Sequence, residues 1–241
     1  MKPSLNVQHE YQQILATLQN PSNVERSPTF DSNFTGSERK TYQIRNPVLR
    51  NIAKDWLKTE ANKATEEVLA LVDLLFTGRS HEERKLASFI IGYRKDIRQQ
   101  VTMAKLDNWL DELTGWAEID SLCQNNFLAP EILGRWAEWQ KLLSALSSNQ
   151  NINKRRASLV FLVGPTRKSN DHRLHEMAYA NIEALKSETD KLITKAISWL
   201  LRSMTNSNKE KVADYLRKEA ATLPNIAVRE TTKQLAFGKL N

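Results

Sequence analysis

Apolar residues recur at helical spacing along nearly the whole chain. In residues 46–58, NPVLRNIAKDWLK, they fall three or four positions apart, with Asn46 placed to cap the helix and Pro47 in its first turn. Residues 80–93 open with Ser80 and Glu83, the spacing of a capping box, and continue as an apolar stripe. The same spacing predicts further helices over residues 5–19, 64–76, 103–113, 116–125, 130–146, 153–163, 172–185, 190–204, 209–221 and 226–237.

The pattern predicts an all-α protein, because no segment alternates apolar and polar residues between hairpin turns. Residues 21–45 are rich in Ser, Thr and Asn and are predicted to be a mostly irregular connection. No long Pro/Gly/Ser-rich linker divides the rest, so we expect one domain over residues 1–241. Short loops between the helices fit either a globular bundle or a stack of helix pairs, and no exact repeat selects between the two.

Charge and composition narrow the class of partner. The chain has 35 Lys and Arg against 28 Asp and Glu, and a net charge of +7 favours a polyanionic partner without proving one. Cys123 is the only cysteine, which excludes an intrachain disulfide and a Cys-rich metal site. No apolar run approaches the roughly 18 residues that span a bilayer. The N-terminus also lacks the apolar core of a signal peptide. We therefore expect a cytoplasmic protein with no membrane partner.

Trp199 stands on the polar side of an amphipathic helix. Its helix carries a tight apolar stripe, and Trp199 points roughly 140° away from the centre of that stripe, beside Lys195 and Arg202. The stripe is formed by Ile193, Ile197, Leu200, Leu201 and Met204. A tryptophan there either covers a neighbouring helix or displays an aromatic face between two cations, as nucleic-acid surfaces do.

Three cations, Lys154, Arg155 and Arg156, open the helix predicted over residues 153–163. Cations in a first helical turn oppose the helix macrodipole. One interpretation is that these cations and the backbone N–H groups of the helix start form a phosphate site. The alternative is a solvated basic turn, or cations paired with acidic neighbours.

Trp116 and Asp120 lie one helical turn apart, at the border of a face whose buried side is marked by Ile119 and Leu122. A carboxylate at such a border is either part of a structural salt bridge or held for chemistry. Other chemistry is not indicated. The chain has no Gly-rich phosphate loop, HExxH, CxxC or GxSxG motif, and His172 and His175 fit a helix start better than a metal site. No metal and no cofactor are expected.

The chain resembles the AlkD-type DNA alkylation repair family, DNA glycosylases built from HEAT-like helix pairs. The resemblance runs in the family's order from about Tyr42 to Leu235. It is carried by IRNPVLRNIAKDWL, HEERKLASFII, LDNWLDELTGWAEID, KRRASLVFLV, KAISWLLR and VRETTKQL. It departs from the family at NINK, where a tryptophan is common shortly before the arginine. The resemblance implies a curved α-solenoid and places the W-x-x-x-D element on Trp116 and Asp120. The family's arginine falls on Arg156 and its second tryptophan on Trp199.

The resemblance also implies a function. We expect a monomeric, monofunctional glycosylase that removes cationic N-alkylpurines, such as 7-methylguanine and 3-methyladenine, from duplex DNA in the bacterial cytoplasm. The catalytic residues would be Asp120, Trp116 and Trp199. The residues expected to bind DNA are Lys154, Arg155, Arg156, Lys195, Arg202 and Phe34. The alternatives are a catalytically silent relative that binds damaged or branched DNA, and a helical scaffold that binds another protein.

Overall fold

The computed structural model describes residues 5–23, 35–60, 63–124 and 126–238. Within these ranges the regular structure is helical, and the only β-type pairing is an isolated bridge between Lys40 and Ser80. The all-α prediction is therefore confirmed for the part of the chain that is described. The helices group into two compact units, residues 1–122 and 123–241, so the prediction of a single domain stays a prediction.

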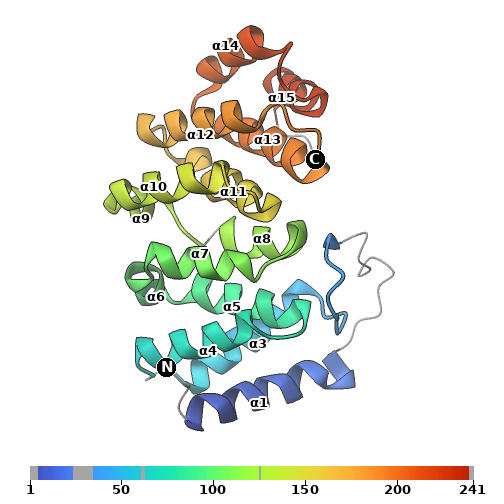
Figure 1. Cartoon of the computed structure of the whole chain (residues 1–241), viewed down its shortest axis with the longest axis vertical. Helices are drawn as coiled ribbons and strands as arrows, with labels where there is room; N and C mark the ends of the chain where they lie inside the picture. Colours follow the sequence, from blue (N-terminus) through green and yellow to red (C-terminus); the bar gives the residue numbers. More distant parts are fainter. Residues whose placement is uncertain (1–4, 24–34, 61–62, 125, 239–241) are drawn as a thin grey trace. The chain divides into compact units, whose positions relative to one another are not determined.

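The first unit packs its helices around α5 (Figure 1). Helix α5 contacts α3 and α4, and α1 contacts α4. Eleven consecutive residues of α5, His81 to Ile91, are buried, so this helix forms the centre of the unit. The elements are α1 (Leu5–Gln19), η1 (Pro21–Asn23), α3 (Asn46–Thr59), α4 (Thr65–Phe76), α5 (His81–Tyr93), α6 (Lys95–Gln100), α7 (Met103–Asp111) and α8 (Gly115–Cys123).

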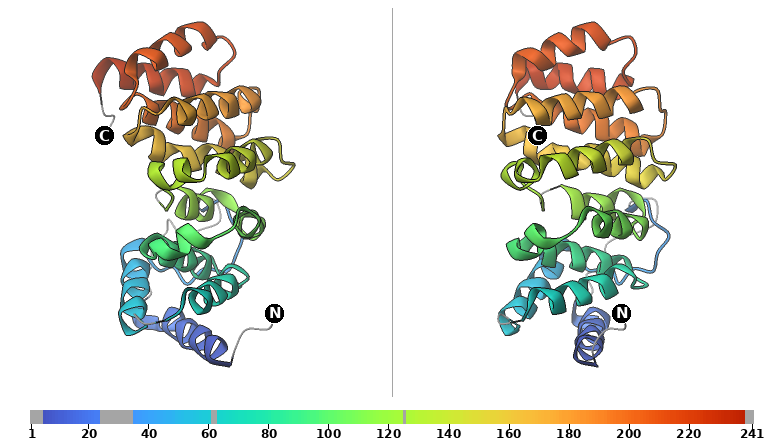
Figure 2. Two further views of the ribbon diagram at one scale, coloured as in Figure 1. Left: turned by 90° about the vertical axis from the view of Figure 1, so that its left-hand side faces the viewer. Right: turned by 60° about the vertical axis from the view of Figure 1, so that its left-hand side comes forward.

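The second unit is two layers of helices. Helix α13 lies between α11 and α15 in one layer, and α10 packs against α12 in the other (Figures 1 and 2). Edge-to-face contacts join Phe127, Trp139 and Phe161, with ring centroids 5.1 to 5.8 Å apart, in the core of this unit. The elements are α9 (Ala129–Gly134), α10 (Trp136–Ser147), α11 (Ile152–Lys168), α12 (His172–Leu185), α13 (Lys191–Met204), α14 (Lys209–Glu219) and α15 (Asn225–Phe237).

Three local predictions were wrong. Helix α3 has Arg45 as its N-cap, and Asn46 is already helical. The helix expected over residues 130–146 is broken at Arg135, whose ψ of 41° is not helical. The helix expected to end at Val163 continues to Lys168 through Pro165. A proline normally ends a helix because it lacks the N–H that would bond four residues back, but here Pro165 and Thr166 are buried, and that packing outweighs the loss.

The capping box of α5 is present as predicted, and the neighbouring Glu82 holds the irregular segment before α3. The Glu83 carboxylate accepts hydrogen bonds from the backbone N–H and the hydroxyl of Ser80. The Glu82 carboxylate accepts from Thr41 Oγ1 at 2.7 Å and from the backbone N–H of Tyr42 at 2.9 Å. Residues 35–45 of the 21–45 connection are thus mostly irregular but fixed to the start of α5 by the buried Glu82 carboxylate, whereas residues 21–23 form η1.

Lys85 is buried in α5, and burial lowers the pKa of its ammonium group from 10.5 to about 8. The unfolded chain keeps the ordinary value and binds more protons between pH 8 and 10.5. The free energy of unfolding therefore rises with pH across that window, and below pH 8 the full penalty of about 3 kcal/mol applies.

We predict that Lys85→Met raises the free energy of unfolding at pH 7 by about 1–3 kcal/mol, because it removes a buried charge. The difference in the free energy of unfolding between Lys85→Met and wild type shrinks as the pH rises from 8 to 10. Urea denaturation followed by circular dichroism measures both effects. Lys95→Met, at an exposed lysine of α6, is the control and leaves stability unchanged. Loss of stability in Lys85→Met at pH 7 would contradict the prediction.

Candidate functional site

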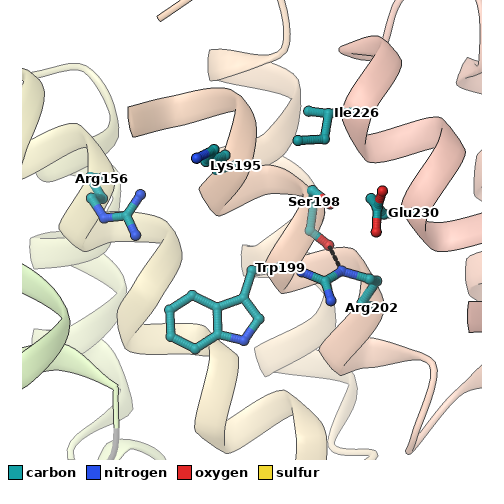
Figure 3. Close-up of a pocket in the computed structure, with 7 residues that line it drawn as sticks. All are labelled: Arg156, Lys195, Ser198, Trp199, Arg202, Ile226 and Glu230. Carbon is teal, nitrogen blue, oxygen red and sulfur yellow. Dashed lines mark hydrogen bonds between the residues drawn. The ribbon is translucent and has the colours of Figure 1, made fainter. Parts of the chain in front are cut away.

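A pocket of about 410 Å³ opens between α11, α13 and α15 of the second unit (Figure 3). Helix α13 contributes most of its lining, and one or two residues come from each neighbouring helix. The lining residues are Arg156 from α11, Lys195, Ser198, Trp199 and Arg202 from α13, and Ile226 and Glu230 from α15.

The amphipathic pattern of α13 explains why Trp199 faces this pocket. All five residues of the predicted apolar stripe are fully buried, while Trp199 is only partly buried. Lys195, Trp199 and Arg202 are spaced by four and three residues, so they share the opposite face. Asp190 caps the start of the helix by accepting a hydrogen bond from the backbone N–H of Leu192 at 2.7 Å.

The pocket is strongly cationic. Three of its lining residues, Arg156, Lys195 and Arg202, are basic, and the single acid, Glu230, is paired with Arg229 at 3.0 Å. In the view of Figure 3 the Trp199 indole lies between Arg156 and Arg202. Such a pocket can hold an anionic group by charge and a flat or sugar ring against the indole.

Backbone contacts hold the two arginines of the pocket. Arg156 is 5% exposed, and its Nη1 donates a hydrogen bond to the carbonyl of Leu192 at 2.5 Å. Arg202 Nε donates to the carbonyl of Ser198, one turn earlier, at 3.3 Å. These bonds restrict both guanidinium groups before any ligand arrives, so less conformational entropy is lost on binding.

Helix α8 of the first unit carries the other predicted pair. Trp116 and Asp120 are each partly buried, while Ile119 and Leu122 on the adjoining face are completely buried. The predicted border position is therefore confirmed. The pair and the pocket belong to different units, and their meeting at one site stays a prediction.

The remaining predicted DNA contacts differ in their surroundings. Arg155 pairs with Glu188 at 2.7 Å and also donates to the carbonyls of Asn149 and Gln150. Lys154 is 3% exposed, so neither side chain is a freely displayed cation. Phe34 lies outside the described residues.

Other site types find little support in the described ranges. These hold no cluster of three or more side chains suited to binding a metal ion. His175 is buried with Nε2 3.0 Å from the carbonyl of Ser169. None of the described helices is long and apolar enough to cross a membrane.

Three lining residues were not predicted, namely Ser198, Ile226 and Glu230. Ile226 and Glu230 are one turn apart on α15, a spacing that marks one helix face but not the neighbour it meets. Ser198 looks like an ordinary buried serine in the sequence. Only the packing of α13 against α15 brings Ile226 and Glu230 to Trp199.

A cationic surface with an aromatic side chain is an arrangement that many nucleic-acid-binding proteins use. The family model described as DNA alkylation repair enzyme matches residues 12–235. The chain belongs to this DNA alkylation repair family, as the sequence resemblance predicted.

The fold is similar to a solved structure described as a predicted DNA alkylation repair enzyme from Enterococcus faecalis. The identity is 18% and the TM-score 0.72, with 91% of this chain and 97% of that chain covered. At this identity the likeness shows the fold alone. A comparison with curated proteins gave no match.

We predict that Ser198→Ala leaves the free energy of unfolding unchanged or raises it slightly. The Ser198 hydroxyl is buried without a hydrogen-bond partner in the described part of the chain, so its removal leaves no partner unsatisfied. The matched control is Ser203→Ala on the same helix, which removes the acceptor of Arg167 Nε at 3.0 Å and costs about 1 kcal/mol. Thermal melts compare the two, and a larger loss in Ser198→Ala than in Ser203→Ala would contradict the prediction.

Proposed function

We propose that this protein is a DNA glycosylase that removes positively charged N-alkylpurines from duplex DNA. Membership of the DNA alkylation repair family supports the substrate class. The observation that carries the proposal is the pocket in which Trp199 lies among Arg156, Lys195 and Arg202. A phosphate and its neighbouring deoxyribose need these two features together, positive charge and an aromatic face.

The charge of the substrate simplifies the chemistry. A 7-alkylguanine or 3-alkyladenine is already cationic, so it leaves as a neutral base when the electron pair of the glycosidic bond passes to it. No general acid is needed to protonate the leaving group. The remaining task is to stabilise the oxocarbenium-like sugar and to direct water to its anomeric carbon.

In the proposal Asp120 performs that task. Its carboxylate faces the developing positive charge and accepts the proton that the attacking water loses as its oxygen bonds to the anomeric carbon. Trp116 and Trp199 hold the deoxyribose, because the negative faces of the indoles favour a neighbouring cation. Arg156 and Lys195 bind the flanking phosphates and so fix the lesion in register.

Incubation with methylated duplex DNA tests the proposal, with released 7-methylguanine and 3-methyladenine measured by chromatography and mass spectrometry. Wild type is expected to release both bases. A protein that binds the methylated duplex without releasing a base would instead be a silent DNA-binding relative. A protein with no salt-sensitive DNA affinity would be a protein-binding scaffold.

Asp120→Asn is expected to lower the single-turnover rate of base release by about 100-fold or more, because the negative charge is lost while the shape is kept. The Kd for duplex DNA should remain close to that of wild type. Asp55→Asn, at an exposed acid of α3, is the control and keeps the wild-type rate. A wild-type rate in Asp120→Asn would remove the proposed role of this carboxylate.

Lys195→Gln is expected to weaken duplex binding and to reduce the slope of log K against log salt by about one, the effect of one lost phosphate contact. Lys191→Gln is the matched control, since Lys191 is exposed one turn earlier on the same helix and does not line the pocket. Equal changes in both variants would indicate a general charge effect and not a contact in the pocket.

A further inference from the structure

Helix α8 begins in backbone contact with the irregular segment before α3. Gly36 and Gly115 both have positive φ, 69° and 74°, a conformation that glycine adopts readily. A Cβ atom on Gly115 would lie 2.2 Å from the carbonyl oxygen of Gly36 and 2.7 Å from that of Thr35. A Cβ atom on Gly36 would lie 3.3 Å from Cδ1 of Trp116. The segment therefore touches both the start of α8 and the indole of Trp116.

The Glu118 carboxylate joins this segment to α5 from inside the unit. Glu118 is completely buried, and its carboxylate oxygens lie within hydrogen-bonding or ion-pair distance of five groups. We call Glu118 and these five partners the Glu118 network. The partners are the backbone N of Thr114 at 2.9 Å, Ser37 Oγ at 3.4 Å, His81 Nδ1 at 3.0 Å, Arg39 Nε at 3.5 Å and Arg84 Nε at 3.9 Å.

The arginines of the network also hold the turn between α7 and α8. Arg39 Nη2 donates to the carbonyl of Glu112 at 2.7 Å and to Thr114 Oγ1 at 3.0 Å. Arg84 Nε donates to the same carbonyl of Glu112 at 2.8 Å. The turn, the helix start and the irregular segment thus share one set of partners.

Helix geometry places this network behind the proposed catalytic pair. At about 100° per residue, Trp116 and Asp120 lie about 40° apart around α8, and Glu118 lies about 160° from each. The Glu118 network therefore holds the face of α8 that is opposite Trp116 and Asp120. Any rotation of the helix that moved the pair would also break the contacts of Glu118.

Stability alone does not explain a network of this kind. Two charged groups pay a large desolvation penalty when they are buried, and well-packed apolar residues of the same volume often stabilise a fold as well or better. What buried, hydrogen-bonded charges can add is a single defined arrangement. That property matters where a catalytic group must be held to within a fraction of an ångström.

We propose that Glu118 is a positioning residue that, with Gly115 and the segment of residues 35–39, sets the rotation of α8 and thereby the placement of Trp116 and Asp120. This inference rests on the proposed glycosylase function. Glu118 itself does not touch the DNA, so its loss should slow the chemical step without weakening binding.

Two variants disturb the network by different means. Glu118→Gln keeps the size of the side chain and removes its charge. Gly115→Ala keeps every charge but places a methyl group against the Gly36 carbonyl. Gly134→Ala is the matched control, because a Cβ atom there meets nothing within 4 Å and the backbone is not in the left-handed region.

The single-turnover rate of base release is expected to fall about tenfold or more in Glu118→Gln and Gly115→Ala, with the Kd for duplex DNA unchanged. Protein labelled with 5-fluorotryptophan gives a second readout. The ¹⁹F resonance of Trp116, assigned with Trp116→Phe, should shift in both variants and stay in place in Gly134→Ala. If a thermal melt shows that Glu118→Gln or Gly115→Ala is unfolded, Arg39→Gln takes the place of that variant.

The two readouts separate the failure of this inference from that of the proposed function. If the wild-type protein releases no base, the glycosylase proposal is overturned. The ¹⁹F shifts of the variants still test the positioning of Trp116 in that case. Wild-type release rates and an unmoved Trp116 resonance in folded Glu118→Gln and Gly115→Ala overturn the positioning role. A loss of DNA affinity equal to the loss of rate would also overturn it, because it would indicate a binding defect.

Discussion

The burial of the Glu118 carboxylate is the constraint on which the first unit depends. An ionised acid without solvent must be surrounded by donors and cations, and its donors come from α5, from the irregular segment before α3 and from the turn before α8. A loop without regular structure is thereby held at a defined place beside a helix. Glu82 does the same at the start of α5, where its carboxylate accepts hydrogen bonds from the backbone N–H groups of Tyr42 and Ile44 in the irregular segment.

In the second unit, apolar packing holds helix α13 in a defined place. The stripe of α13 is completely buried, and α13 is enclosed by α11 on one side and α15 on the other. A helix fixed in this way has a definite rotation, and its remaining face displays Lys195, Trp199 and Arg202. Two cations of the pocket, Arg156 and Arg202, are hydrogen-bonded to backbone carbonyls of this unit.

Local rules predicted the helices well where the signals were local. The capping box of Ser80 and Glu83 is present, and α12 spans the predicted residues. The errors fell where longer-range contacts override local preference. Helix α11 runs through Pro165, which is buried together with Thr166, and the chain breaks at Arg135 between α9 and α10 although the apolar spacing continues. Neither burial nor a change of direction between packed helices is visible in a window of one or two turns.

The sequence by itself determined the fold class, the faces of the helices and the unusual positions of Trp199, Trp116 and Asp120, since these follow from helical periodicity and from the chemistry of single side chains. Tertiary structure decided what surrounds each of these residues. Arg155 looked like Arg156 in the sequence, but Glu188, 33 positions away, pairs with it, whereas Arg156 lines the pocket. Glu118 was unremarkable until its burial among distant cations was seen. Residues far apart in the chain meet only through tertiary packing, and the local sequence pattern does not say which of them will meet.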